Sequence, residues 1–145
     1  MQKQLIKWYQ ENKRDFPWRK DQDPYHIWIS EIMLQQTTTE TVIPYYNRFL
    51  KNFPNVEALA SASLEEVYKM WEGLGYYRRA KHIHESAQII LEKYQGVFPY
   101  EYDAILSLKG IGEYTAGAIS SIAYGKQVPA VDGNVLRIIS RYYLI

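Results

Sequence analysis

The sequence contains no cysteine among its 145 residues. The chain therefore has no thiolate nucleophile, no disulfide and no cysteine-ligated metal. It also lacks an apolar run near the roughly 20 residues that a membrane-spanning helix needs. Its first residues show no secretory signal pattern. These absences favour an intracellular protein with no membrane association.

The sequence has almost no net charge, since 17 Lys and Arg face 16 Asp and Glu for a formal charge of +1. Strong non-specific nucleic-acid binders usually carry a clear basic excess. A nucleic-acid function would therefore depend on a local grip rather than on global charge. Hydrophobic residues make up 47% of the chain and aromatic residues 15%, which indicates a globular domain. Most of the rings are expected in the core, and exposed ones could stack on bases.

No segment alternates with a period of two, and apolar residues instead recur at helical spacing. This pattern predicts an all-α fold of many short helices. Asp23-Pro24 has the form of an N-cap followed by proline, and Ser63 with Glu66 has the form of a capping box. Pro44 is expected in the first turn of its helix. Residues 15–19 are expected to form an extended turn. The expected helices cover about residues 5–12, 24–34, 42–53, 56–60, 64–71, 79–94, 101–108, 114–123 and 133–144. The helix over 24–34 is apolar nearly all round, so we expect it to be buried.

A turn containing Gly110 and Gly112 joins two of the expected helices. Glycines there allow positive φ and a close approach of another chain, and the following helix presents unpaired N–H groups to an anion. Residues 106–119 resemble the helix-hairpin-helix motif of DNA repair glycosylases. The resemblance implies that the amides of Lys109, Gly110, Ile111 and Gly112 bind the DNA backbone. It also implies a monovalent cation at backbone 108–113, with no metal ligand from side chains.

Four further motifs extend the likeness, namely Pro17-Trp18-Arg19, residues 29–37, residues 71–77 and residues 131–135. Together they resemble adenine DNA glycosylases of the MutY type, within the endonuclease III superfamily. The resemblance implies a six-helix barrel domain over 16–125, with the helix-hairpin-helix at about 106–119. It implies that 1–15 and 126–145 are an incomplete part of a second helical domain. Lys109 departs from the family, where proline is more common.

The same resemblance implies the function. Members excise adenine mispaired with 8-oxoguanine or guanine from double-stranded DNA, and we expect this chain to act as a nucleoid-associated monomer. Full-length members continue through a four-cysteine [4Fe–4S] segment, whose ligands are absent here. The chain therefore looks like the N-terminal piece of such a protein, and we expect weak or absent activity from it alone.

Two carboxyl groups are candidates for the catalytic acid and the catalytic anion. Glu31 has Ile27, Trp28 and Leu34 as helical neighbours, and their desolvation favours a neutral acid; a half-exposed or salt-bridged glutamate is the alternative. Asp132 precedes a helix, where an N-cap role and a persistent negative charge are compatible. By resemblance, Glu31 protonates adenine at N7 and Asp132 is the catalytic aspartate.

Asn134 and Tyr114 complete the predicted catalytic set. Asn134 is expected to orient Asp132 or the attacking water. By resemblance, Tyr114 occupies the site where bifunctional relatives carry a lysine nucleophile, and tyrosine cannot form a Schiff base. The chain is therefore interpreted as a monofunctional glycosylase. The alternatives are a bifunctional endonuclease III-like glycosylase/lyase and a helix-hairpin-helix DNA-binding module without chemistry.

The remaining predicted site residues open the duplex and hold the extruded base. By resemblance, Gln36 and Tyr76 wedge beside the opposite base, with help from Leu74. The adenine pocket is assigned to Trp18, Arg19 and Leu34. The basic cluster of Arg78, Arg79 and Lys81 either contacts phosphates or forms a solvated face.

Overall fold

The computed structural model describes all 145 residues and contains helices but no strand, which confirms the all-α prediction. None of the helices combines the length and the apolar character required to cross a membrane. The elements in chain order are α1 (Gln2–Asn12), the 3₁₀ turn η1 (Pro17–Arg19), α2 (Pro24–Leu34), α3 (Thr39–Asn52), α4 (Val56–Ser61), α5 (Leu64–Trp71), α6 (Arg78–Tyr94), α7 (Tyr102–Leu106), α8 (Glu113–Tyr124) and α9 (Gly133–Tyr143).

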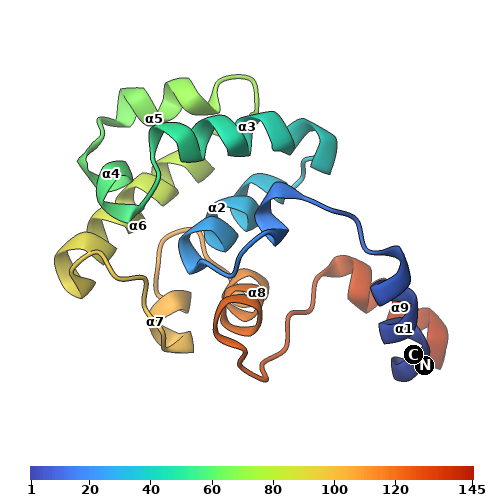
Figure 1. Cartoon of the computed structure of the whole chain (residues 1–145). Helices are drawn as coiled ribbons and strands as arrows, with labels where there is room; N and C mark the ends of the chain where they lie inside the picture. The colour runs from blue at the N-terminus through green and yellow to red at the C-terminus, as the bar shows by residue number, and fades with distance from the viewer.

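Helix α2 lies at the centre of the molecule, between α3–α5 on one side and α7 and α8 on the other (Figure 1). It packs against α3, α6 and α8. Because it is enclosed on several sides, seven of its residues are buried, as its apolar sequence predicts. Trp28, Ile29 and Met33 have no measurable exposure. The surrounding helices therefore hold α2 in place, and with it the side chains on its one uncovered face.

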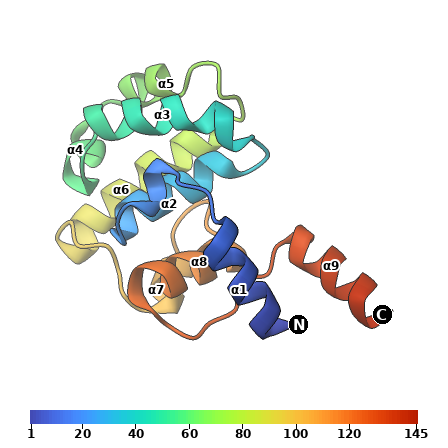
Figure 2. The ribbon, with the colours of Figure 1, turned by 45° about the vertical axis from the view of Figure 1, so that its right-hand side comes forward.

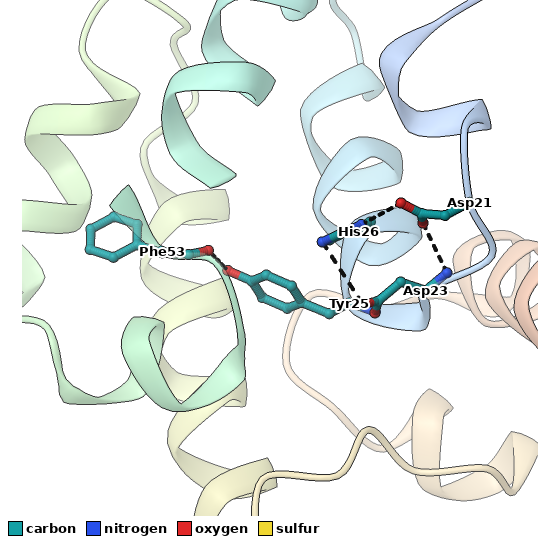
Figure 3. Close-up of polar contacts among 5 residues, drawn as sticks. All are labelled: Asp21, Asp23, Tyr25, His26 and Phe53. Carbon is teal, nitrogen blue, oxygen red and sulfur yellow. Dashed lines mark hydrogen bonds and ion pairs between the residues drawn. The ribbon is translucent and has the colours of Figure 1, made fainter. Parts of the chain in front are cut away.

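The N-terminal end of α2 is anchored by polar contacts (Figure 3). The Asp23 side chain caps the helix by accepting from the Tyr25 N–H at 2.9 Å, as predicted. The Tyr25 hydroxyl donates to the buried Phe53 carbonyl at 2.7 Å, which ties α2 to the end of α3. The His26 ring lies 2.9 Å from Asp21 and 3.8 Å from Asp23. These contacts hold the start of α2 in one place.

Two local predictions differ from the structure. Helix α3 begins at Thr39, three residues before the expected start, so Pro44 lies inside the helix rather than in its first turn. The proline is tolerated because the Glu40 carbonyl, which loses its helical partner, lies on an exposed residue. The stretch expected to be extended from Asp15 to Arg19 instead closes into the 3₁₀ turn η1.

Helices α1 and α9 lie together at one end of the molecule in Figure 1, and Figure 2 shows α9 projecting away from the body. Neither contains a buried residue. Apolar side chains on both are largely uncovered, including Leu5 and Trp8 on α1 and Leu136 and Ile138 on α9. The two terminal helices therefore contribute little to the hydrophobic core.

Tyr25→Phe should lower the free energy of unfolding by about 1–3 kcal/mol, because it leaves the Phe53 carbonyl buried without its donor. Urea denaturation measures the change. Tyr142→Phe is the matched control, since Tyr142 on α9 is exposed and its hydroxyl makes no hydrogen bond within the chain, so its effect should be near zero. Equal stabilities for the two variants would contradict the anchoring role.

Candidate active site

One large cleft, with a volume of about 980 Å³, lies beside the open face of α2. Its walls come from four separate segments, which are residues 9–22, α2 with the residues after it, α8, and the start of α9. The cleft brings together all of the predicted catalytic and adenine-pocket residues, together with one predicted wedge residue. These are Trp18, Arg19, Glu31, Leu34, Gln36, Tyr114, Asp132 and Asn134.

Glu31 projects from α2 into this cleft. Desolvation by the surrounding protein raises the pKa of its carboxyl above the ordinary value of 4.5. The Tyr114 hydroxyl and the Arg19 charge act in the opposite direction, while the negative charge of Asp132 adds to the increase. The geometry thus favours a carboxyl that keeps its proton at a higher pH than a solvated glutamate would.

Asp132 is the N-cap of α9, as its sequence position predicts. One carboxylate oxygen accepts from the Val135 N–H at 2.9 Å. The other accepts from the Asn134 side-chain amide at 3.1 Å, and Arg137 donates to the Asn134 oxygen at 3.2 Å. Both oxygens are engaged as acceptors, which fixes the position of the carboxylate. Asn134 therefore contacts Asp132 directly.

Tyr114 lies in the first turn of α8 and faces the two carboxyl groups. Burial raises the pKa of its hydroxyl to about 12, and the charges of Glu31 and Asp132 contribute to the increase. The hydroxyl stays protonated at neutral pH and can donate to the Glu31 carboxyl. The cleft also contains an amine that the sequence patterns did not single out, since Lys13 lies on its wall.

The path of the chain into Asp132 depends on a glycine of α8. A Cβ built at Gly117 would overlap the Pro129 carbonyl oxygen and come within 3.3 Å of the Ala130 Cα. The close neighbour of this glycine is therefore the loop that leads to Asp132.

The aromatic wall of the cleft is held by stacking. The rings of Phe16 and Trp18 stack with centroids 4.9 Å apart, and Tyr46 meets Trp18 edge-on at 5.5 Å. The Arg19 guanidinium lies 4.9 Å from the Phe16 ring centroid and donates to the Arg14 carbonyl. Trp18 is itself only 8% exposed, so it combines a core role with its place on the cleft wall.

A second, smaller hollow of about 240 Å³ adjoins the first. It brings the predicted wedge residues Gln36 and Tyr76 together with Lys109 and Gly110 of the hairpin. Gln36 lines both hollows, so the wedge and the cleft are contiguous at this residue. Gln36 and Tyr76 both adopt positive φ, at 58° and 51°, which is uncommon for residues other than glycine.

The hairpin between α7 and α8 has the expected open backbone. Gly110 adopts φ of 76° against His82, whereas Gly112 has φ of −96° and is the N-cap of α8, so the prediction of positive φ is wrong at Gly112. No atom lies within 4 Å of a Cβ built at Gly112. The N–H groups of Gly110, Gly112 and Glu113 find no acceptor within the chain. The turn therefore offers exposed donors on an unobstructed surface.

Two predicted DNA-contacting side chains, those of Leu74 and Arg79, are engaged within the protein. Leu74 is 7% exposed and belongs to the core, so it presents no free side chain to the surface. The Ile111 side chain is equally buried, but the predicted contact of this residue is through its amide. Lys109 is exposed and lies 4.0 Å from the Glu85 carboxylate. Arg79 points inward and binds main-chain carbonyls, which corrects the expectation that it faces phosphate or solvent. The Ile32 and Gln35 carbonyls are distant in sequence from Arg79, so no local pattern could have revealed these two partners.

No group of three or more His, Asp or Glu side chains is placed to hold a metal ion. An iron–sulfur cluster is held mainly by cysteine thiolates. Since the chain has no cysteine, its own residues do not fit such a cluster.

The family model for the HhH-GPD superfamily of base excision DNA repair proteins matches residues 29–145. An adenine DNA glycosylase of Buchnera aphidicola subsp. Acyrthosiphon pisum is 50% identical over 140 residues, covering 96% of this chain and 40% of the relative. The adenine DNA glycosylase of Homo sapiens is 45% identical over 146 residues, covering 94% of this chain and 27% of the relative. The chain thus spans well under half the length of these curated relatives.

Solved structures show the same fold. A thermostable thymine-DNA glycosylase superimposes with a TM-score of 0.92 at 34% identity, covering 97% of this chain and 65% of the other. A non-covalent endonuclease III–DNA complex gives a TM-score of 0.84 at 23% identity, covering 99% and 68%. The second likeness concerns the fold alone.

Gly117→Ala should lower the free energy of unfolding by about 1–3 kcal/mol, because the added methyl group meets the Pro129 backbone. Helix propensity alone predicts the opposite sign, a gain of about 1 kcal/mol. Urea denaturation separates the two, with Gly133→Ala as the control because nothing lies within 4 Å of its added Cβ. A stabilised Gly117→Ala variant would show that the close approach does not constrain the loop.

Proposed function

Since this chain belongs to the HhH-GPD superfamily of base excision DNA repair proteins, we propose that it is the catalytic core of an adenine DNA glycosylase. The substrate is adenine mispaired with 8-oxoguanine or guanine in double-stranded DNA, bound by a monomer at the nucleoid. The observation that carries the proposal is the placement of Glu31 and Asp132, from distant parts of the chain, on the wall of one cleft. The curated relatives named adenine DNA glycosylase support the choice of base.

The chemistry requires a proton on the leaving base and an anion near the sugar, much as in glycoside hydrolysis. Glu31 donates its proton to N7 of the extruded adenine, and the glycosidic bond then breaks with its electron pair leaving on the base. The raised pKa of Glu31 keeps this acid available at a higher pH. A water then attacks C1′ of the sugar cation and gives its proton to the Glu31 carboxylate, which restores the acid.

Asp132 supplies the anion that stabilises the sugar cation between these steps. Its oxygens are held by Val135 N–H and Asn134, so the charge is fixed in position before the reaction. Trp18, Arg19 and Leu34 form the walls against which the adenine is held, and Tyr114 orients the Glu31 carboxyl. The two carboxyl groups have different environments, which is the condition for separate acid and anion roles.

The hairpin binds DNA through local main-chain groups, since the chain has almost no net charge. The free N–H groups of Gly110 and Gly112 bind a phosphate of the backbone. Main-chain carbonyls of 108–113 hold a monovalent cation beside it, although the Leu108 and Lys109 carbonyls already accept one hydrogen bond each within the chain. Gln36 and Tyr76, with support from the buried Leu74, fill the space left by the extruded base.

Residues 16–125 are proposed to form the barrel domain, and 1–15 with 126–145 to belong to a second helical domain. The absence of buried residues on α1 and α9 supports this division. Any iron–sulfur cluster of that domain would need cysteines from outside this chain. Because Asp132 caps a helix with no buried residue, we expect weak or absent turnover from this chain alone.

Two observations favour other reactions. Lys13 on the cleft wall is an amine that could attack the sugar, as a bifunctional lyase requires. The likeness to a thymine-DNA glycosylase favours thymine as a second base. A single-turnover assay on 8-oxoguanine:adenine and guanine:thymine duplexes distinguishes these reactions from adenine release. Strand cleavage is measured with and without alkali. Strand breaks without alkali would indicate a lyase. Binding without base release, with equal affinity for mispaired and matched duplexes, would indicate a module without chemistry.

Glu31→Gln should reduce adenine release by roughly 10²–10⁴-fold while largely sparing duplex binding, because only the general acid is lost. Single-turnover release from an 8-oxoguanine:adenine duplex at excess protein measures the rate. Wild-type release should also fall as pH rises through the raised pKa of Glu31, since the protonated form is required.

Glu92→Gln, on an exposed residue of α6, is the control and should match the wild type. Near-normal release by Glu31→Gln would remove Glu31 from its role. Release by this chain at the rate of a full-length family member would refute the expectation of weak turnover. No release, with equal affinity for mispaired and matched duplexes, would contradict the proposed function.

A further inference from the structure

Arg79 on α6 is the most highly connected polar side chain in the structure. Its guanidinium donates to the carbonyls of Ile32 at 2.7 Å, Met33 at 3.2 Å and Gln35 at 2.7 Å, all at the C-terminal end of α2 or just beyond it. It also donates to the Gly75 carbonyl at 3.2 Å, in the loop before α6. One side chain thus joins two turns that are far apart in the sequence.

The two turns share an unusual backbone feature. Arg79 binds the Gln35 and Gly75 carbonyls, and the residue after each of them has positive φ, namely Gln36 at 58° and Tyr76 at 51°. The only other residues besides glycine with positive φ are Gln95 and Leu144, which end α6 and α9. A left-handed conformation in a residue with a side chain persists only where the surrounding structure enforces it. Arg79 is placed to enforce it at both positions.

The guanidinium is itself fixed by aromatic rings. It lies 5.3 Å from the Trp71 ring centroid and 5.5 Å from the Tyr76 ring centroid. The Trp71 indole N–H donates to the same Gly75 carbonyl at 3.0 Å. A planar guanidinium with five donors can serve several carbonyls and stack on a ring at once, whereas a lysine ammonium cannot reproduce this arrangement.

We propose that Arg79 is a positioning residue that holds Gln36 and Tyr76 as one preformed wedge and ties that wedge to α2, which carries Glu31. Its role rests on the proposed function, because the wedge acts only when a base is extruded. Gln36 and Tyr76 both line the second hollow, and Gln36 also lines the cleft. Insertion of the wedge and placement of the acid are therefore coupled through the carbonyls that Arg79 binds.

Hydrogen exchange of the free protein tests the coupling without any DNA. In Arg79→Lys and Arg79→Gln, amides in peptides covering 33–38 and 72–77 should both exchange at least about tenfold faster than in the wild type, because both turns lose their shared donor. Peptides covering the hairpin at 106–113 should be unchanged. Arg48→Lys is the matched control, since the Arg48 guanidinium lies over the Tyr45 ring and binds no carbonyl.

Faster exchange in only one of the two turns, or in neither, would overturn the proposal. So would loss of protection throughout the chain in both variants, because Arg79 would then be a general core residue. These outcomes do not depend on catalysis, so they separate the role of Arg79 from the function of the cleft.

Base extrusion supplies the second readout. A duplex with 2-aminopurine at the target position opposite 8-oxoguanine should brighten on binding the wild type. In Arg79→Lys this increase in fluorescence should be at least about tenfold smaller, while the affinity for the duplex stays within about threefold of the wild-type affinity. An unchanged signal would overturn the positioning role, whereas absence of the signal in the wild type, with the exchange pattern intact, would count against the proposed function.

Discussion

The burial of α2 is the constraint on which the rest of the structure depends. Packing against α3, α6 and α8 buries seven residues of this helix and leaves Glu31, its only carboxylate, on the wall of the cleft. The same packing that stabilises the fold removes water from the carboxyl and raises its pKa. The packing of α2 therefore supports both the stability of the fold and the raised pKa of Glu31. A loosely packed α2 would expose both the core and the Glu31 carboxyl to water.

Each end of α2 is held by a different set of hydrogen bonds. Asp23 and Tyr25 fix the N-terminal end, and Arg79 binds the carbonyls at the C-terminal end. Both ends of the helix are thereby tied to neighbouring segments. Asp132 reaches the cleft by another route, through a loop that passes closely over Gly117. The acid and the anion are thus held in the cleft by contacts from different parts of the chain.

Local patterns predicted the helices well, because caps and apolar periodicity act over a few residues. The capping box of Ser63 and Glu66 and the bounds of α5 were confirmed. The start of α3 was missed because Pro44 looked like a first-turn residue, although the helix tolerates it further in. The inward position of Arg79 could not be predicted, since its carbonyl partners at Ile32 and Gln35 meet it only through tertiary packing. Placing Glu31 beside Asp132 depended on the family resemblance and not on their spacing.

A direct measurement of the Glu31 carboxyl tests the central claim. The ¹³C chemical shift of its carboxyl carbon, followed through a pH titration of glutamate-labelled protein and assigned with Glu31→Gln, reports its pKa. We expect a pKa above 4.5 in the wild type and a lower value in Asp132→Asn, because the neighbouring negative charge is removed. A pKa at or below 4.5, or one that ignores the loss of Asp132, would contradict the pairing of a desolvated acid with a fixed anion.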